Sequence, residues 1–368
     1  MSAVLGLLLF LGAIPYFSFV VLMIRGLLKS QPISIESESE LPSVAVIIAA
    51  RNEAHNLPAL LDDLLEQNYQ GAFSCIIADD RSTDDTWSII HKFSKAHPHF
   101  TAVRVVTEST EMTGKKNALT QCIKNTTATL LIETDADCRV GPGWIASMVA
   151  SFDENTGIVV GFSSVRERSL FAIYQAIDFL GIMMTNAGMM YYGKAWSGSG
   201  QNLAFRRSHF TSIGGFLGDP NQSIGDDFYL VQKIGKLKGV KTVFAWIPES
   251  FVTTSPSQSL LEFFQQRRRW ASDSRGLQGK DPLFFVFLVA AFLLNTSILL
   301  LVLSTNISSA LLWVLLLKFM LEFLILLLGL KLTNRKQDIW VFLIWFLIQP
   351  IYIPIMGVAG LFGQVKWK

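Results

Sequence analysis

The chain has 368 residues, of which 51% are hydrophobic and 16% are charged, so it is more apolar than an average soluble protein. Its formal net charge of +2 implies no broad basic surface, which argues against nucleic acid as a partner. The three cysteines, Cys75, Cys122 and Cys138, lie far apart without C-x-x-C spacing. They predict neither a disulfide framework nor a zinc site.

The first segment in chain order is an apolar stretch over residues 4–28, which is longer than the about 20 residues that span a bilayer. No basic residue precedes it, and Arg25 and Lys29 stand at its end, which is the wrong polarity for a secretory signal peptide. The positive-inside rule places that end in the cytoplasm. We therefore predict an N-terminal transmembrane helix over 1–29, followed by a polar linker over 30–41.

After residue 42 the pattern changes to apolar strands that alternate with helical segments. This alternation is typical of parallel βαβ units, in which ligands bind at the carboxyl ends of the strands. Three strand ends carry polar sequences, ARNE, DDRSTDD and ETDAD, and the fold is expected to bring them to one cleft. We predict one α/β domain over 42–259. Its expected strands are 44–49, 75–78, 103–106, 130–132, 158–162 and 240–247.

The strand at 130–132 runs directly into the acidic stretch 133–137. In extended backbone, residues two apart point to the same side, so Asp135 and Asp137 can converge on one point. Adjacent carboxylates repel each other, and a divalent cation removes that conflict. Hard oxygen ligands suit Mg²⁺ or Mn²⁺. An isolated D-x-D is also common in polar loops. The prediction of a metal site therefore depends on whether the other two polar strand ends lie beside this one.

Residues 169–192 allow two interpretations. The segment is rich in Met and aromatic residues, yet it carries Gln175, Asp178 and Asn186 and is too polar for a clear membrane span. It predicts either a helix at the membrane surface or acceptor groove, or an ordinary core helix.

Two further polar segments have ordinary explanations as well as functional ones. Asp226 and Asp227 begin a helical pattern, where the helix dipole favours acidic residues, so capping accounts for one of the two. The segment 260–280 contains the amphipathic stretch LLEFFQQRRRWAS and is expected to lie on the membrane surface. Contacts with anionic lipid explain its arginines but not its Q-x-x-R-W spacing.

Apolar segments return in the C-terminal region. Those at 284–303 and 311–330 are long enough to span a bilayer, with basic residues on both outer flanks. The segment 339–362 is interrupted by two prolines, and the sequence leaves open whether it crosses once or re-enters. We therefore expect 281–368 to form C-terminal transmembrane helices.

Taken in order, the motifs ARNE, DDRSTDD, GKKNAL, DAD, IGGF, GDD and QRRRW resemble those of the membrane-bound family 2 glycosyltransferases. The resemblance covers about residues 42–275. It implies the GT-A fold, an α/β fold with a Rossmann-like, mostly parallel sheet. It also implies an inverting transfer of a sugar from a nucleotide donor, usually a UDP-sugar, with Mg²⁺ or Mn²⁺ as cofactor.

The resemblance implies donor-binding roles for residues that match the family's first motifs. Arg51 and Glu53 fall where the first loop meets the nucleotide, and Asp79 and Asp80 match the pair that contacts base and ribose. Lys115 matches the basic position of the G-K motif.

The later motifs imply the metal site, the base and the acceptor site. Asp135 and Asp137 match the metal-binding D-x-D, and Asp135 also counts among the donor-binding residues. Asp227 matches the aspartate taken as general base, whereas Asp226 stands where Glu is common, which shortens its reach by one methylene. The Q-x-x-R-W signature near acceptor and diphosphate is matched by Gln266, Arg269 and Trp270.

Three interpretations of function remain open. The first is a multi-pass membrane glycosyltransferase with a cytoplasmic catalytic domain and a lipid or lipid-linked acceptor. The second is a processive polysaccharide synthase, for which three or four apolar segments are few unless a partner subunit or homo-oligomer supplies more. The third is a non-catalytic membrane scaffold with a decayed transferase domain, against which the intact carboxylates argue.

Overall fold

The computed structural model describes residues 2–30, 41–112, 114–166, 168–218, 225–272 and 281–362. Contacts divide the chain into two compact units. The helical unit comprises Met1–Ser30, Glu167–Tyr192 and Pro256–Val365, and the α/β unit comprises Gln31–Arg166, Gly193–Ser255 and Lys366–Lys368. Most of the predicted linker at 30–41, residues 273–280 of the predicted surface segment and residues 363–368 lie outside the described ranges.

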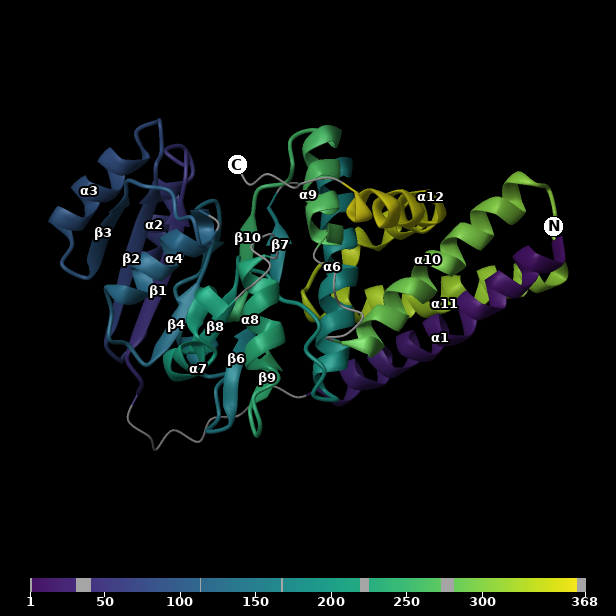
Figure 1. The fold of residues 1–368 in the computed structure, drawn as a ribbon, viewed down its shortest axis with the longest axis horizontal. Helices are drawn as coiled ribbons and strands as arrows, with labels where there is room; N and C mark the ends of the chain where they lie inside the picture. Colours follow the sequence, from purple (N-terminus) through teal and green to yellow (C-terminus); the bar gives the residue numbers. More distant parts are fainter. Residues whose placement is uncertain are drawn as a thin grey trace. The chain divides into compact units, whose positions relative to one another are not determined.

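The α/β unit contains a seven-stranded sheet (Figure 1). Its strands are β1 (Val44–Ala50), β2 (Phe73–Asp80), β3 (Phe100–Val105), β4 (Leu130–Glu133), β6 (Thr156–Val160), β8 (Leu203–Arg206) and β9 (Lys241–Phe244). They lie in the order β3-β2-β1-β4-β8-β6-β9. Only β8 is antiparallel to its neighbours. The predicted mostly parallel α/β fold is confirmed, and β8 is an additional strand that the sequence analysis did not predict.

Helices cover both faces of this sheet. Val44, Val46 and Ile48 of β1 belong to one apolar core that includes leucines of α2 and residues of α5. The helix α4 also packs against β1 and β2, but its buried residues are not part of that core. This double cover explains why β1, with the sequence VAVIIAA, is buried along nearly its whole length. The helices of the unit are α2 (Leu57–Leu65), α3 (Thr86–Ala96), α4 (Gly114–Lys124), α5 (Trp144–Val149), α7 (Arg207–Ser212) and α8 (Asp226–Ile234).

A second, three-stranded sheet lies in the same unit and consists of β5 (Arg139–Val140), β7 (Ser163–Val165) and β10 (Val252–Thr254). Its order is β5-β10-β7, with β10 antiparallel to β5 and parallel to β7. Because β5 begins two residues after Asp137, this small sheet fixes the chain as it leaves the D-x-D stretch.

Among its described residues, the helical unit contains five segments that are long and apolar enough to cross a membrane. Its elements are α1 (Ser2–Lys29), α6 (Leu170–Met190), α9 (Leu260–Ser272), α10 (Pro282–Leu303), α11 (Ser309–Leu332), the 3₁₀ turn η4 (Lys336–Val341) and α12 (Phe342–Leu361). The five candidate spans are α1, α6, α10, α11 and the stretch formed by η4 and α12.

The helix α6 belongs to the helical unit, which differs from the sequence-based placement of these residues inside the domain 42–259. It packs against α1, α11 and α12. It is also the most buried of the five candidate spans, at 67% against 33–44% for the others. This burial agrees with the core-helix interpretation of 169–192.

The proline-containing segment forms one continuous helix, α12, with both Pro350 and Pro354 inside it. The break considered for 339–362 is therefore not seen in the described residues. Neighbouring groups satisfy the backbone positions that proline leaves open in helices of this kind.

Small residues bring the helices α1 and α6 into backbone contact. A methyl group added at Gly26 would lie 2.0 Å from the carbonyl oxygen of Gly188, and one added at Gly188 would lie 2.5 Å from the Met23 carbonyl oxygen. Apolar helices commonly pack closely through glycines in this way.

We expect Gly26→Ala to lower the free energy of unfolding by about 1–3 kcal/mol, the usual effect of overpacking, because the Gly188 carbonyl is rigid backbone. Gly6→Ala is the matched control, since nothing lies within 4 Å of a methyl group at that position of the same helix. Thermal unfolding in detergent measures both variants. Equal melting temperatures would contradict the close helix contact.

Candidate functional site

The topology brings the carboxyl ends of β1, β2 and β4 to one edge of the sheet. The strand β1 lies between β2 and β4 and is parallel to both, so the chain order reverses at β1. Open α/β sheets bind ligands at such switch points. Arg51 directly follows β1 and is exposed, Asp79 and Asp80 end β2, and Asp135 follows β4 by two residues.

The loops after β1 and β2 are joined by hydrogen bonds. The backbone N–H of Asn52 donates to Ser82 Oγ (2.9 Å), and Asn52 Oδ1 accepts from the N–H of Thr83 (2.8 Å). The N–H of Glu53 donates to Thr86 Oγ1 (2.8 Å). Asn52 has a φ of 57°, in the left-handed region that Asn adopts more readily than most residues. The two predicted nucleotide loops therefore form one rigid structure.

Both acidic residues at the end of β2 are buried. Asp80 Oδ1 accepts a hydrogen bond from Arg81 Nε (2.9 Å). A methyl group on Gly114 would lie 2.4 Å from Asp80 Oδ2, so the first residue of α4 touches this carboxylate. Asp79 Oδ1 has no hydrogen-bond partner among the described residues. Because an unpaired buried acceptor is unfavourable, a bound ligand with a donor group would stabilise this position.

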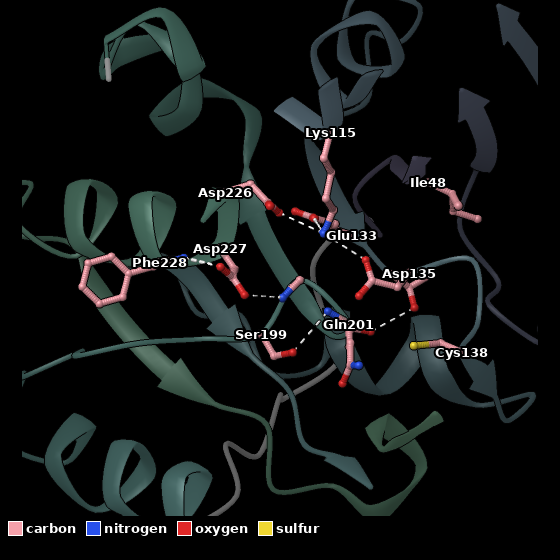
Figure 2. Close-up of polar contacts among 12 residues, drawn as sticks. Ile48, Lys115, Glu133, Asp135, Cys138, Ser199, Gln201, Asp226, Asp227 and Phe228 are labelled. Carbon is pink, nitrogen blue, oxygen red and sulfur yellow. Dashed lines mark hydrogen bonds and ion pairs between the residues drawn. The ribbon is translucent and has the colours of Figure 1, made fainter. Parts of the chain in front are cut away.

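Lys115, the second residue of α4, joins three carboxylates (Figure 2). Its Nζ lies 2.9 Å from Asp135 Oδ1, 3.1 Å from Glu133 Oε1 and 3.1 Å from Asp226 Oδ2. Burial acts to lower the pKa of Lys115, but the charges of these three carboxylates outweigh burial and raise the pKa well above its usual value. The ammonium therefore stays charged and connects the D-x-D stretch with the start of α8.

Glu133 is a member of this cluster that the sequence analysis did not select. It is fully buried at the end of β4. Burial, followed by the charge of Asp226, raises the pKa of Glu133 well above its usual value. The sequence did contain a signal for this role, because Glu133 is an acidic residue at the end of an apolar strand that is covered on both faces. A carboxylate in such a position requires a buried cation as its partner.

Asp137 is oriented by residues beside and within the three-stranded sheet. Thr254 Oγ1 donates to Asp137 Oδ2 (3.1 Å), and Arg166 donates from Nη2 to the Asp137 carbonyl oxygen (3.2 Å). Burial, followed by the charges of Asp135 and Glu53, raises the pKa of Asp137 to about 6. This part of the site therefore holds more negative charge than its own side chains neutralise.

The chemistry of Asp135 and Asp137 fits Mg²⁺ or Mn²⁺. Both offer hard carboxylate oxygens, and a divalent cation would relieve the repulsion that raises the pKa of Asp137. Within the described residues, no group of three or more His, Cys, Asp or Glu side chains is arranged to hold a metal alone. The remaining coordination positions would fall to water and substrate phosphate oxygens, as is usual for Mg²⁺.

Asp226 and Asp227 are the first two residues of α8 but have different partners. Although burial raises the pKa of Asp226, the charge of Lys115 holds it down at about 2. Asp227 Oδ2 accepts from the N–H of Gly200 (3.0 Å), and Oδ1 accepts from the N–H of Phe228 (2.7 Å). Burial, followed by the charge of Asp226, raises the pKa of Asp227 to about 6. Asp227 is thus the carboxylate suited to taking up a proton near neutral pH.

Helix capping does not account for Asp226. The residue at the N-cap of α8 is Gly225, which has no side chain to cap the helix, and it is Asp227 whose Oδ1 accepts from a first-turn N–H, that of Phe228. Asp226 is instead held by its ion pair with Lys115.

The loop before β8 closes this side of the site, and the sequence analysis assigned it no role. A methyl group on Gly200 would lie 2.7 Å from Lys115 Nζ, 2.9 Å from Glu133 Oε1 and 3.1 Å from Asp226 Oδ2. A side chain at this position would have to displace the ends of these three charged groups, and the Gly200 N–H also holds Asp227. The sequence signal was the Gly/Ser-rich run at 197–200.

The three predicted Q-x-x-R-W residues belong to α9 of the helical unit, whereas the carboxylates, Lys115 and Arg51 belong to the α/β unit. All three are partly exposed. Of the apolar residues at the start of α9, Phe263 is buried whereas Leu260, Leu261 and Phe264 are exposed. Arg267, between the predicted residues, is buried as well.

Residues 45–214 of the chain match the family described as glycosyl transferase family 2, and residues 131–356 match glycosyl transferase family group 2. A mannosyltransferase from Pyrobaculum calidifontis, solved with GDP-mannose and Mn²⁺, has a similar fold. The TM-score is 0.61 at 20% identity, with 95% of this chain and 99% of that chain covered.

Three curated relatives show the range of named activities. An N-acetylglucosaminyltransferase of Mesorhizobium japonicum is 26% identical over 62% of this chain and 55% of its own length. A beta-monoglucosyldiacylglycerol synthase of Nostoc sp. is 27% identical over 64% of this chain and 50% of its own length. A poly-beta-1,6-N-acetyl-D-glucosamine synthase of Staphylococcus aureus is 24% identical over 72% of this chain and 62% of its own length.

The chain thus spans 50–62% of the length of these curated relatives. One family match alone covers residues 131–356, more than half of the chain. The motifs ARNE, DDRSTDD and ETDAD lie at the carboxyl ends of the parallel strands β1, β2 and β4, as the sequence predicts. This protein belongs to the family 2 glycosyltransferases.

Proposed function

We propose that this protein transfers a sugar, with inversion, from a nucleotide donor to a lipid or lipid-linked acceptor at the cytoplasmic face of a membrane. The observation that carries the proposal is the division of labour among the clustered carboxylates. Asp135 and Asp226 share the cation Lys115, whereas Asp227 is held by backbone N–H groups and has a pKa of about 6. An inverting transfer requires a carboxylate that is free to accept a proton, here Asp227, separate from the carboxylates that are paired with a cation.

We assign donor binding to the edge formed by β1, β2 and β4. Asp79 and Asp80 are the candidates for base and ribose, and the unpaired buried oxygen of Asp79 supports this role. Arg51 and Glu53 are candidates for contacts with the nucleotide. We expect a UDP-sugar as donor.

We assign the divalent cation to Asp135 and Asp137. Bound there, Mg²⁺ or Mn²⁺ would stabilise the negative charge that collects on the leaving nucleotide diphosphate. The mannosyltransferase of similar fold was solved with Mn²⁺ and a nucleotide sugar, which supports this assignment. Lys115 orients Asp135 through its contact with Oδ1.

We assign the role of general base to Asp227. Its carboxylate takes the proton of the acceptor hydroxyl as that oxygen attacks the sugar, and no covalent intermediate forms. Asp226 positions the start of α8 through its ion pair with Lys115. This role explains how aspartate is sufficient at a position where the family commonly has the longer glutamate.

The Q-x-x-R-W residues are assigned on the family resemblance. Arg269 is suited to the diphosphate, because its planar guanidinium can donate two parallel hydrogen bonds. Gln266 and Trp270 are the candidates for acceptor contacts.

The membrane assignment is supported by five candidate spans and by α9. Exposed apolar side chains on α9, such as Leu261 and Phe264, fit a helix that rests on a membrane surface. The basic flanks of the apolar segments favour a cytoplasmic α/β unit. One relative is named for a diacylglycerol glycolipid, which makes a lipid acceptor a reasonable first test.

The test is a panel of UDP-glucose, UDP-N-acetylglucosamine, UDP-galactose and GDP-mannose with purified protein in detergent. Nucleotide release is measured with Mn²⁺ or with EDTA, and with or without diacylglycerol. We expect release to require the metal and to increase with lipid. Equal turnover in EDTA would contradict the metal assignment, and no turnover with any donor would contradict the proposed function.

The raised pKa of Asp227 predicts the pH dependence. A base must be deprotonated to act, and a pKa of about 6 means that protonation begins at a higher pH than for an ordinary aspartate. We therefore expect kcat/KM to fall as pH decreases through about 6. The profile should be recorded at saturating Mn²⁺, which keeps Asp137 ionised. A rate that stays constant down to pH 4.5 would argue against Asp227 as the base.

A processive polysaccharide synthase remains the second candidate, because one relative is named as a poly-beta-1,6-N-acetyl-D-glucosamine synthase. In that case a partner subunit or a homo-oligomer would be expected to complete the polymer path. Sizing the product by gel or mass spectrometry separates the two candidates. A ladder of long glycans would favour the synthase, and a single added sugar would favour the lipid glycosyltransferase.

A further inference from the structure

A polar residue of α6, Gln175, holds the chain just before α9. Gln175 exchanges two hydrogen bonds with the backbone of Ser257, just before α9 begins: its Nε2 donates to the carbonyl oxygen (3.1 Å), and its Oε1 accepts from the N–H (2.9 Å). Gln175 is buried, so these bonds are shielded from water. They fix the point at which the chain enters α9.

Asp178, three residues further along α6, holds the middle of α9. Its Oδ2 accepts a hydrogen bond from Arg267 Nε at 2.7 Å, and both side chains are at least 95% buried. Asp178 Oδ1 accepts from Trp345 Nε1 of α12 (3.2 Å). Gln175 and Asp178 lie on one side of α6 because residues three apart share a helix face. Two of the three polar residues that made 169–192 ambiguous, Gln175 and Asp178, therefore contact α9 or the chain just before it.

Arg267 carries this contact into the Q-x-x-R-W motif. Its Nη1 donates to Gln266 Oε1 (2.5 Å), and its guanidinium carbon lies 4.1 Å from the centre of the Trp270 ring. The other side of the motif is also supported from α6, since the rings of Phe179 and Trp270 are 5.4 Å apart. A single buried arginine thus contacts two of the three motif residues.

We propose that Asp178 and Arg267 are positioning residues for the acceptor site, which set the orientation of Gln266 and Trp270 through the buried ion pair between α6 and α9. The inference rests on the proposed function, because it takes the motif residues as acceptor contacts. Arg267 occupies a variable position of the motif and acts without touching substrate. Asp178 is 89 residues away from Arg267 in the sequence and belongs to no motif.

The expected consequence is specific to the acceptor. Loss of the Asp178 charge weakens the hold on the Arg267 side chain, so the guanidinium that packs on the Trp270 ring is less firmly placed. A displacement of about 1 Å at a positioned group can reduce activity by about 10²-fold. The nucleotide loops belong to the α/β unit and keep their own hydrogen bonds. We therefore expect a higher KM for the acceptor and an unchanged KM for the donor.

The experiment compares Asp178→Asn and Arg267→Lys with Glu322→Gln as matched control. Glu322 on α11 is also part of a buried ion pair in the helical unit, 2.7 Å from Lys318, and it accepts from the Tyr16 hydroxyl. Its loss removes a buried negative charge of the same kind, and neither partner lies in α9. Arg267→Lys keeps a cation beside Asp178, so it tests the geometry if Asp178→Asn does not fold.

Each protein is assayed with the donors of the panel above and diacylglycerol or monoglucosyldiacylglycerol in mixed micelles. We expect Asp178→Asn to raise the acceptor KM at least tenfold, Arg267→Lys to raise it several-fold, and both to leave the donor KM within twofold. Glu322→Gln should lower the melting temperature and change neither KM. A purely structural role reduces the active fraction, which lowers kcat but not the affinity for acceptor.

The outcomes separate the two claims. If the wild-type protein transfers sugar and both α6–α9 variants keep the wild-type acceptor KM, the positioning role is wrong and the proposed function stands. If the wild-type protein transfers sugar to neither lipid with any donor, the proposed lipid acceptor is wrong, and the inference fails with it. A rise in donor KM equal to that for acceptor would also reject an acceptor-specific role.

Discussion

Asp227→Asn is expected to lower kcat for sugar transfer by about 10²–10⁴-fold, the usual contribution of a general base. Asparagine has nearly the same shape, and its carbonyl oxygen can still accept from the N–H of Gly200, as Asp227 Oδ2 does at 3.0 Å. It cannot accept the proton of an attacking hydroxyl. The KM for the donor should change little, because the nucleotide is assigned to the ends of β1 and β2.

Asp153→Asn is the control for the same chemical change in the same unit. Asp153 pairs with Lys241 (2.9 Å) in a largely exposed ion pair, where such pairs contribute little to stability. Its kcat per folded enzyme should equal that of the wild-type protein. Transfer that survives Asp227→Asn at the wild-type rate would remove Asp227 from the reaction.

Asp137→Ala is expected to abolish metal binding and lower transfer by about 10²–10³-fold, since a metal contributes several kcal/mol of charge stabilisation. The remaining Asp135 is shared with Lys115, so it cannot replace the lost ligand. Mn²⁺ binding by electron paramagnetic resonance measures the first effect without substrate, and nucleotide release measures the second.

Thr254→Val provides a graded comparison for Asp137→Ala. It keeps both carboxylates and removes only the hydrogen bond to Asp137 Oδ2 (3.1 Å). We expect a loss of about tenfold in Mn²⁺ affinity, within the range for groups that orient a metal ligand. The metal assignment is wrong if Asp137→Ala binds Mn²⁺ as tightly as the wild-type protein.

Elements with a strong local pattern were predictable from the sequence. The β-branched run of β1 ends one residue beyond the expected bounds, and the stretch LLEFFQQRRRWAS forms α9 along its whole length. In each case the residue types of neighbouring positions are enough to predict which side chains are buried. β8 was missed because LAFR is short and becomes a strand only by pairing with β4 and β6.

Much of the candidate site was not predictable, because its partners are fixed by topology rather than by spacing. The motifs named Lys115 and Asp226, but nothing in the sequence indicated that they meet or that Glu133 joins them. The same holds for Asp178 and Arg267, which only the packing of α6 against α9 brings together. Long-range ion pairs of this kind have no periodic signature.

The reversed direction of β8 has a consequence for how this enzyme can diversify. Because β8 runs opposite to β4, the loop before it crosses the end of β4, and the wall it presents is made of main chain at Gly200. A wall without side chains offers no gradual adjustment: a larger residue there collides with Lys115 Nζ. New substrate preferences in proteins built this way are therefore expected to arise from side chains elsewhere around the site, while the main chain at Gly200 stays constant.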